Sequence, residues 1–133
     1  MLESYRVILA SNSPRRKELL AGVGISFEVM TIPGIDESFP DTLKGGDIPL
    51  FLARKKSDAY QDILRDNVLV ITADTIVWQD GKVLGKPKDR REAVEMIAEL
   101  SGRSHTVYTG VCVLEALLKK RLFIQSLRYF LMS

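Results

Sequence analysis

The sequence predicts an α/β fold in which a mixed sheet is flanked by helices. Short apolar runs alternate along the chain with segments of helical length, which is the arrangement typical of α/β domains. The 133 residues are 46% hydrophobic and 27% charged, as in an ordinary globular domain. Glycine and proline separate the runs only in the first 114 residues, where they mark turns.

The first strand and helix are expected next to one another. Residues 5–11 (YRVILAS) form a run of branched apolar side chains, as in a strand buried on both faces. Ser13 can then cap a helix whose first position suits Pro14. We expect this helix to cover residues 14–21 and to end at the glycines that follow.

A second strand and a long loop precede the second helix. Residues 25–32 alternate between apolar and polar side chains, while residues 33–46 contain two prolines and three glycines. A loop of this length is unusual for a passive connection. Residues 47–65 are predicted to form a helix that Asp47 caps and that carries Pro49 in its first turn.

The centre of the sheet is assigned to residues 68–73 (VLVITA), the most apolar strand candidate. Residues 76–78 and 82–84 flank the pair Asp80-Gly81, which favours a type I′ hairpin turn. Asp89 and Glu92 have the spacing of a capping box, so a helix is expected from there to residue 100. Residues 106–114 form the next predicted strand.

The remaining residues, 115–133, differ from the body of the chain. Residues 1–114 carry 15 basic and 16 acidic side chains, a net charge of −1, and the tail carries four basic and one acidic, a net charge of +3. We therefore divide the chain into a domain over 1–114 and an atypical basic and apolar tail over 115–133. Read as a helix, the tail would have only a moderately apolar face, which disfavours a membrane role. We expect it to pack onto the sheet of its own chain or against a second copy.

Composition excludes several classes of protein. One cysteine cannot form an intramolecular disulfide, and one histidine leaves no cluster for structural zinc. There is no apolar run long enough to span a bilayer and no signal-peptide pattern, so a cytoplasmic protein is expected. The body of the chain is slightly acidic and lacks interleaved basic and aromatic residues, which disfavours nucleic-acid binding.

The segment SNSPRR at residues 11–16 is the first candidate site. It lies between a predicted buried strand and a helix, where helix amides favour an anion. The hydroxyl of Ser11 can donate a hydrogen bond, and the guanidinium of Arg15 or Arg16 can bind a phosphate. Neighbouring residues on a helix diverge, so both arginines cannot face one ligand. The alternative is a capped helix with solvated arginines.

Asp74 follows the central apolar run and is the second candidate. A carboxylate at the end of such a strand lies at the rim of the sheet, where it can hold magnesium or orient a water molecule. The alternative is a turn acid or a helix cap. Capping is less attractive here because a hairpin, not a helix, is expected to follow.

Further charged residues complete a mixed site. Lys86, between a turn glycine and a proline, can reach a phosphate, and Lys56 is a weaker candidate because basic pairs on helices are usually solvated. Asp36 and Glu37, in the long loop, could add a metal ligand or a specificity contact, and the alternative is a loop that is simply acidic. Cations at 15, 16, 56 and 86 with acids at 37 and 74 suit a polyphosphate that carries a divalent ion.

These residues fall in sequence blocks that resemble the Maf family of nucleotide pyrophosphatases. Six blocks occur in the family's order and approximate spacing between residues 5 and 113: LASNSPRRKELL, IDE, LARKKSDA, ITADTIV, LGKPKD and LSGRSHTVYTGV. The resemblance implies the α/β fold shared with ITPase-like proteins, with a cleft between two lobes and frequent homodimers. It also implies Mg²⁺-dependent, or Mn²⁺-dependent, hydrolysis of nucleoside triphosphates to monophosphate and pyrophosphate.

The resemblance assigns roles to individual residues. Ser11, Arg15 and Arg16 would bind the phosphates of the substrate, and Lys56 and Lys86 would neutralise them. By the same resemblance, Glu37 and Asp74 would serve the metal ion or the attacking water. SPRR together with ADTIV is more similar to the branch acting on dTTP and UTP than to the branch preferring 7-methyl-GTP.

The chain departs from the family after the TGV at residues 109–111. Family members continue with further strands and a glycine-rich block that supplies more polar residues to the cleft, so we expect an incomplete second lobe. A truncated or frameshifted chain is the simplest interpretation, and a divergent short form is its rival. The prediction is a pyrophosphatase fold with impaired or lost catalysis, and the alternative is a non-catalytic nucleotide- or phosphate-binding module.

Overall fold

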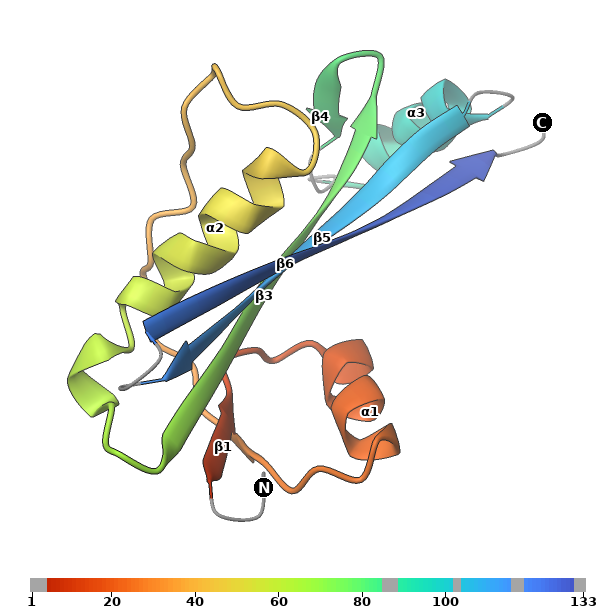
Figure 1. Ribbon diagram of the computed structural model, residues 1–133. Helices are drawn as coiled ribbons and strands as arrows, with labels where there is room; N and C mark the ends of the chain where they lie inside the picture. The colour runs from red at the N-terminus through yellow and green to blue at the C-terminus, as the bar shows by residue number, and fades with distance from the viewer. Residues whose placement is uncertain (1–4, 85–88, 102–103, 116–118, 131–133) are drawn as a thin grey trace.

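The computed structural model describes residues 5–84, 89–101, 104–115 and 119–130. Their strands form one six-stranded mixed sheet in the order β2-β1-β3-β5-β6, with β4 paired to β3 as well. Helices flank this sheet, which confirms the predicted α/β class (Figure 1). Within these residues no helix is both long and apolar enough to cross a membrane.

The parallel part of the sheet is short. β1 (Arg6–Leu9) lies between β2 (Glu28–Val29) and the first residues of β3 (Val68–Gln79), and pairs in parallel with both. β2 is far shorter than the predicted strand over 25–32. The chain leaves the sheet after Met30 because the amide of Ile32 donates to the hydroxyl of Tyr60, 3.0 Å away, instead of to a strand.

α1 (Pro14–Gly22) follows β1 as predicted. The Ser13 side chain accepts a hydrogen bond from the amide of Arg16 at 3.4 Å, so it caps the helix in the expected way. The chain passes through Gly24 with a φ of 81°, a backbone angle that glycine adopts without strain. α1 lies on the opposite face of the sheet from α2, because Ile71 and Ala73 face α1 across a cavity while Thr72 contacts α2.

α2 (Asp47–Asp58) is shorter than the predicted helix over 47–65. Asp47 is its first residue and not its cap, since Gly46 occupies the capping position without a side-chain hydrogen bond; the carboxylate instead stands in the first turn, where the helix dipole favours it. The helix ends where the amide of Tyr60 bonds to Ser57 O. A separate 3-10 turn, η2 (Gln61–Ile63), then leads to β3.

β3 is one strand of 12 residues, where the sequence predicted two strands separated by Asp74. It stays continuous because it pairs antiparallel with β5 (Ser104–Glu115) from Leu69 to Trp78 without interruption. On its other edge β3 has two partners in turn. β1 pairs with it as far as Ile71, and β4 (Lys82–Leu84) pairs with it from Val77 onwards.

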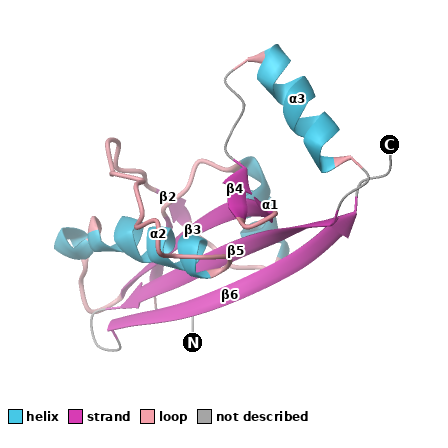
Figure 2. Ribbon diagram, turned by 90° about the horizontal axis from the view of Figure 1, so that it is seen from above, coloured by secondary structure: helices cyan, strands magenta, loops and turns pink. Residues whose placement is uncertain are grey.

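The hairpin between β3 and β4 forms as predicted. Asp80 and Gly81 at its tip have φ angles of 52° and 78°, and two consecutive positive values are the mark of a type I′ turn. α3 (Arg90–Leu100) is capped by Asp89, whose carboxylate accepts from the amide of Glu92 at 2.8 Å. Seen from above, α3 stands apart from the sheet (Figure 2).

The tail forms an edge strand. β6 (Lys119–Phe130) pairs antiparallel with β5 along its full length, from Glu115 opposite Lys119 to Ser104 opposite Phe130. The tail therefore packs within its own chain, which is one of the two predicted alternatives. Figure 1 shows β3, β5 and β6 as three long strands that cross the molecule together.

α2 packs tightly against the sheet. The Thr72 hydroxyl donates to Ala53 O at 2.7 Å, which ties β3 to the helix. Gly110 of β5 lies so close to the start of α2 that a Cβ atom there would be 2.5 Å from Leu50 N. Because the helix lies directly on these strands, the residues of its last turn are held at a fixed place above β3.

Candidate active site

A notch in the sheet lies at the centre of the candidate site. Residues 72–76 of β3 have no strand partner among the described residues on the edge that β1 and β4 share. Asp74 lies in this notch. The sequence placed Asp74 at the carboxyl end of a strand, which is wrong for β3 itself. It nevertheless lies just beyond the end of the parallel partner β1, where ligands bind in open α/β sheets.

Lys56 is the basic residue at the notch. Its ammonium group is 2.8 Å from Asp74 Oδ1, 3.3 Å from Ala73 O and 3.6 Å from Glu37 Oε1. The side chains of Lys56 and Asp74 are 19% and 15% exposed, whereas that of Glu37 is 67% exposed. Lys56 is thus no solvated helix residue. Two carboxylates from different segments meet at one positive charge.

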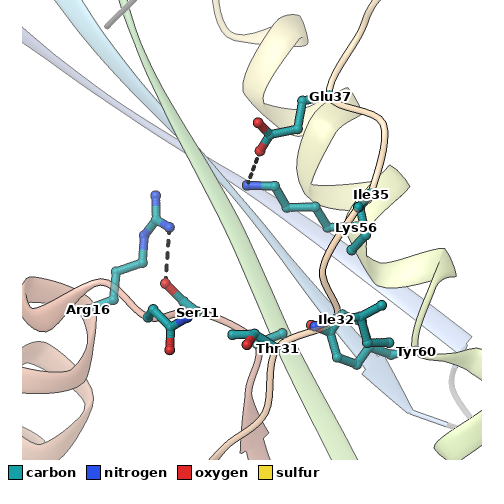
Figure 3. Close-up of a pocket in the computed structure, with 11 residues that line it drawn as sticks. Ser11, Arg16, Thr31, Ile32, Ile35, Glu37, Lys56 and Tyr60 are labelled. Carbon is teal, nitrogen blue, oxygen red and sulfur yellow. Dashed lines mark hydrogen bonds and ion pairs between the residues drawn. The ribbon is translucent and has the colours of Figure 1, made fainter.

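Arg16 supplies a second cation on the other side of the notch. Its guanidinium donates to Ser11 Oγ at 3.4 Å and to Thr75 Oγ1 at 3.0 Å. Thr75 Oγ1 lies 3.0 Å from Thr109 Oγ1 of β5. Figure 3 shows Arg16 reaching from α1 toward Ser11, opposite the pair of Glu37 and Lys56. A phosphate group between these side chains would meet two cations.

Two cavities open at these residues, and both are lined by Arg16, Glu37 and Lys56. The smaller, about 350 Å³, extends past Ser11 to Tyr60. The larger, about 650 Å³, extends past Asp74 to the β3–β4 hairpin and to α3. The apolar side chains on the wall of the larger cavity are Phe39, Leu52, Ile76, Val77, Val83, Leu84 and Met96.

The structure brings together most of the residues that the sequence singled out. Ser11, Arg16, Glu37 and Lys56 line the smaller cavity, and Asp74 joins the last three of these at the larger one. Arg15 is exposed and lines neither of these two cavities, in keeping with the divergence of neighbours on a helix. Lys86 lies outside the described residues.

The polar contacts that support this site were not predicted from the sequence, although Asp36 was named as a possible metal ligand or specificity contact. Thr75 follows Asp74 directly, but its link to Arg16 joins residues 59 positions apart. Asp36, Ser38 and Lys55 form a second group beside Glu37, with Lys55 Nζ 3.0 Å from Asp36 Oδ2. The available signal was their position next to Glu37 and Lys56. The Ser38 and Lys55 hydrogen bonds hold the pKa of Asp36 at about 2, below its usual range.

The carboxylates of Glu37 and Asp74 fit a metal ion that takes its other ligands from a bound phosphate and from water. Among the described residues there is no cluster of three or more His, Cys, Asp or Glu side chains that could hold an ion. Glu37 and Asp74 alone converge, and they do so on the ammonium of Lys56. Mg²⁺ is usually bound by one or two carboxylates with substrate phosphates and water. The pair therefore fits an ion that arrives with a polyphosphate.

Comparison with solved structures supports the fold. A Ham1 protein of Staphylococcus aureus superposes with a TM-score of 0.55 at 15% identity, over 92% of this chain and 70% of that one. A HAM1 protein of Coxiella burnetii gives the same TM-score and identity, over 94% and 71% of the two chains. At this identity the likeness concerns the fold alone.

Comparison with curated proteins gives much higher identities. A protein of Bacteroides fragilis (strain YCH46) named dTTP/UTP pyrophosphatase is 59% identical over 112 residues, which are 84% of this chain and 58% of that protein. A protein of the same name from Parabacteroides distasonis is 51% identical over 113 residues. This chain thus spans somewhat over half the length of these relatives.

The match to a family covers both the site and most of the tail. Residues 6–128 match the family described as Maf-like protein, so the match runs past residue 114. It includes the notch, the two adjacent lysines in the last turn of α2 and the capped start of α1. A match of this extent, together with relatives of more than half identical sequence, shows that the chain belongs to the Maf family.

Proposed function

We propose that the chain carries the phosphate-binding and hydrolytic centre of a nucleoside triphosphate pyrophosphatase that acts on dTTP and UTP. The observation that carries the proposal is the meeting of Lys56, Asp74 and Glu37 in the notch, with Arg16 and Ser11 opposite. The curated relatives bear the name dTTP/UTP pyrophosphatase. Their name supports the choice of substrate, and the geometry supports the type of reaction.

The phosphates of the substrate would lie between the two cations. Arg16 comes with a helix N-terminus, whose amides and dipole favour an anion, and its guanidinium can form two parallel hydrogen bonds to a phosphate. Lys56 adds a compact charge on the other side. Ser11 Oγ, which already contacts Arg16, can turn to donate to a phosphate oxygen. The resemblance to the family would give Lys86 a further phosphate contact, whereas Arg15, which lines neither cavity, is left outside the proposed phosphate site.

Glu37 and Asp74 would hold Mg²⁺, or Mn²⁺, together with the substrate phosphates. When bound, the ion would neutralise charge on the phosphates. Asp74, the less exposed carboxylate, would also accept a proton from a water molecule as its oxygen attacks the α-phosphorus. The bond from the α-phosphorus to the bridging oxygen then breaks, the monophosphate keeps the new hydroxyl oxygen, and pyrophosphate leaves.

The nucleoside would lie in the larger cavity. Phe39, Ile76 and the β3–β4 hairpin give this cavity apolar walls, which suit the faces of a base. The smaller cavity carries Ser11 and Asn12, which suit phosphate oxygens. We propose that the chain works in the cytoplasm and as a homodimer.

Pyrophosphate release tests the proposal. Purified chain is incubated with dTTP, UTP or 7-methyl-GTP and Mg²⁺, and pyrophosphate is measured by an enzyme-coupled assay. Release from dTTP and UTP, at the impaired rate that the sequence predicts, is expected to be well above that from 7-methyl-GTP, and EDTA should abolish it. The Asp74→Asn chain should turn over about 10²-fold more slowly, as for loss of a general base.

Two results would contradict the proposal. If the chain binds dTTP and releases no pyrophosphate, it is a nucleotide-binding module. If Asp74→Asn turns over as fast as the unaltered chain, the base is another residue. Arg54→Met, which changes an exposed residue of the same helix as Lys56, is the control for preparation and folding.

A further inference from the structure

We propose that Asp36, Ser38 and Lys55 form a clamp that positions Glu37 at the notch. They are positioning residues: none of them is among the lining residues of the two cavities. The inference deepens the proposed function and rests on it, because it concerns how the chain presents a metal-binding carboxylate.

Glu37 needs external support. Its side chain is 67% exposed, and its contact with Lys56 is an ion pair at 3.6 Å, which is longer than a hydrogen bond. It belongs to the connection over residues 33–46, which contains no helix or strand. A free loop would hold such a side chain in many orientations, each with a different distance to Asp74. The backbone around Glu37 must therefore be fixed by its neighbours.

Asp36 and Ser38 fix the backbone on both sides of Glu37. The amide of Ser38 donates to Asp36 Oδ1 at 2.9 Å, and the Ser38 hydroxyl donates to Asp36 Oδ2 at 2.9 Å. Both carboxylate oxygens are thus used within one tight turn of the type that aspartate favours. Glu37 is the central residue of this turn, so its Cα–Cβ direction follows from the two bonds.

Lys55 attaches the turn to α2. Its ammonium donates to Asp36 Oδ2 at 3.0 Å and to Ser38 O at 2.8 Å, and it lies 3.4 Å from Ser38 Oγ. The ammonium also lies 5.7 Å from the centre of the Phe51 ring, one turn earlier in the helix. A lone exposed ion pair contributes little. Here one ammonium binds a side chain and a backbone carbonyl of the same turn.

The two adjacent lysines form ion pairs with two adjacent acidic residues. Lys55 holds Asp36 and Lys56 holds Glu37, because side chains of neighbouring helix residues diverge. Apolar contacts extend the attachment on either side of the turn: Ile35 packs against the core cluster that contains Tyr60, and Phe39 packs against the cluster that contains Leu52. The backbone is thus attached on both sides of Glu37, and the clamp determines the direction in which the Glu37 side chain extends toward Lys56 and Asp74.

The test compares Lys55→Met, which keeps the length of the side chain and removes its donors, with Arg54→Met as the matched control. The first readout is the Mg²⁺ concentration that gives half-maximal pyrophosphate release from dTTP. The second is the affinity for Mn²⁺, from its EPR signal, when the chain holds the non-hydrolysable α,β-methylene analogue of dTTP. Thermal unfolding is recorded for every variant.

We expect Lys55→Met to need about 10-fold more metal in both measurements, which is the usual effect of removing a partner of a metal ligand. Turnover at saturating Mg²⁺ should recover most of the loss, since excess metal compensates for a poorly placed carboxylate. Lys55→Arg, which keeps donors for Asp36, should restore the metal requirement to within about three-fold of the original. A merely structural role would lower the melting temperature without this selective change.

The outcomes separate the inference from the proposed function. If Lys55→Met and Arg54→Met need the same metal concentration in both measurements, the inferred clamp is wrong. A chain that binds Mn²⁺ with the analogue and releases no pyrophosphate overturns the proposed function, and the EPR comparison of the variants still decides on the clamp. A chain that binds no Mn²⁺ with the analogue overturns both.

Discussion

Lys56 and Asp74 form the least exposed ion pair of the site, with 2.8 Å between Nζ and Oδ1. Taking two such charges out of water has a free-energy cost that their attraction only partly offsets. Removing one partner leaves the other charge unpaired and raises that cost. In the proposed mechanism, function and stability therefore depend on the same two side chains.

Lys56→Met tests this dependence. We expect the free energy of unfolding to fall by about 1–3 kcal/mol because Asp74 keeps its charge and loses its partner. Urea titration of Lys56→Met, Asp74→Asn and the double variant provides the measurement. The double variant should be more stable than Lys56→Met alone. If the two single losses simply add, the pair contributes no coupling energy.

Cys112 is a fully buried titratable group of β5, with no exposed surface. Burial raises the pKa of its thiol above the ordinary 9.0. The folded chain thus keeps this proton at a pH where the unfolded chain releases it. Its contribution to stability is complete below pH 9 and is lost as the pH rises through the raised pKa.

Alkylation checks this state of Cys112. At pH 8 iodoacetamide should label the folded chain much more slowly than the chain in 6–8 M urea, roughly in proportion to the fraction unfolded. Mass spectrometry gives the labelled fraction over time. Rapid labelling without urea would mean that β5 opens readily and that α2 does not cover this thiol.

Among the elements, α2 and β5 approach each other closely. Gly110 is the residue that permits it, because a Cβ atom there would be 2.5 Å from Leu50 N and 2.6 Å from Pro49 C and O. These are backbone atoms of the helix start, which cannot rotate away as a side chain can. The distance from the sheet to the lysines of α2 is thus set by the absence of one methyl group.

Gly110→Ala should push α2 off the sheet. We expect a loss of about 1–3 kcal/mol, as for overpacked cores, and a weaker nucleotide affinity because Lys56 moves with the helix. Differential scanning calorimetry and a nucleotide titration measure the two effects. Gly22→Ala is the matched control, since a Cβ atom at Gly22 has nothing within 4 Å. An unchanged melting temperature for Gly110→Ala would contradict the close approach.

Local sequence signals predicted the elements that depend on local chemistry. The caps at Ser13 and Asp89 and the Asp80-Gly81 turn formed as expected, because each requires only neighbouring residues. The continuity of β3 through Asp74 was not predictable in this way. It results from pairing with β5, more than 30 residues later in the chain. Likewise, Tyr60, just beyond the end of α2, accepts a hydrogen bond from the amide of Ile32, a contact between distant segments that local signals do not indicate.

The candidate site shows the same contrast between what local sequence predicts and what depends on contacts between distant segments. Residue types and spacing predicted that Ser11, Arg16, Glu37, Lys56 and Asp74 belong together, and the fold brings them together. The supporting contacts were not predictable, since Thr75, Thr109 and Lys55 act across elements whose register the sequence does not specify. The position of Asp74 in a strand, instead of at its end, was missed for the same reason.

At the scale of the whole molecule, β6 covers the edge of β5. An uncovered edge offers unpaired amide and carbonyl groups to another chain. Deletion of residues 116–133 should therefore produce assemblies with more subunits than the full chain forms. Size-exclusion chromatography with light scattering measures the number of subunits for both chains. A monodisperse species with an unchanged number of subunits would show that β6 protects nothing of importance.

The notch also has a consequence for how the sheet exchanges its amide protons with solvent. In β3 the odd-numbered residues direct their backbone groups toward the β1 and β4 edge, as Ile71 O does toward Ala10 N. Ala73 and Thr75 share this direction and lie where that edge has no strand partner within the described residues. In deuterated buffer the amides of Ala73 and Thr75 should exchange faster than the amide of Val77, although all three belong to one continuous strand. Nucleotide should slow them selectively, so that a single strand reports both the fold and the occupation of its site.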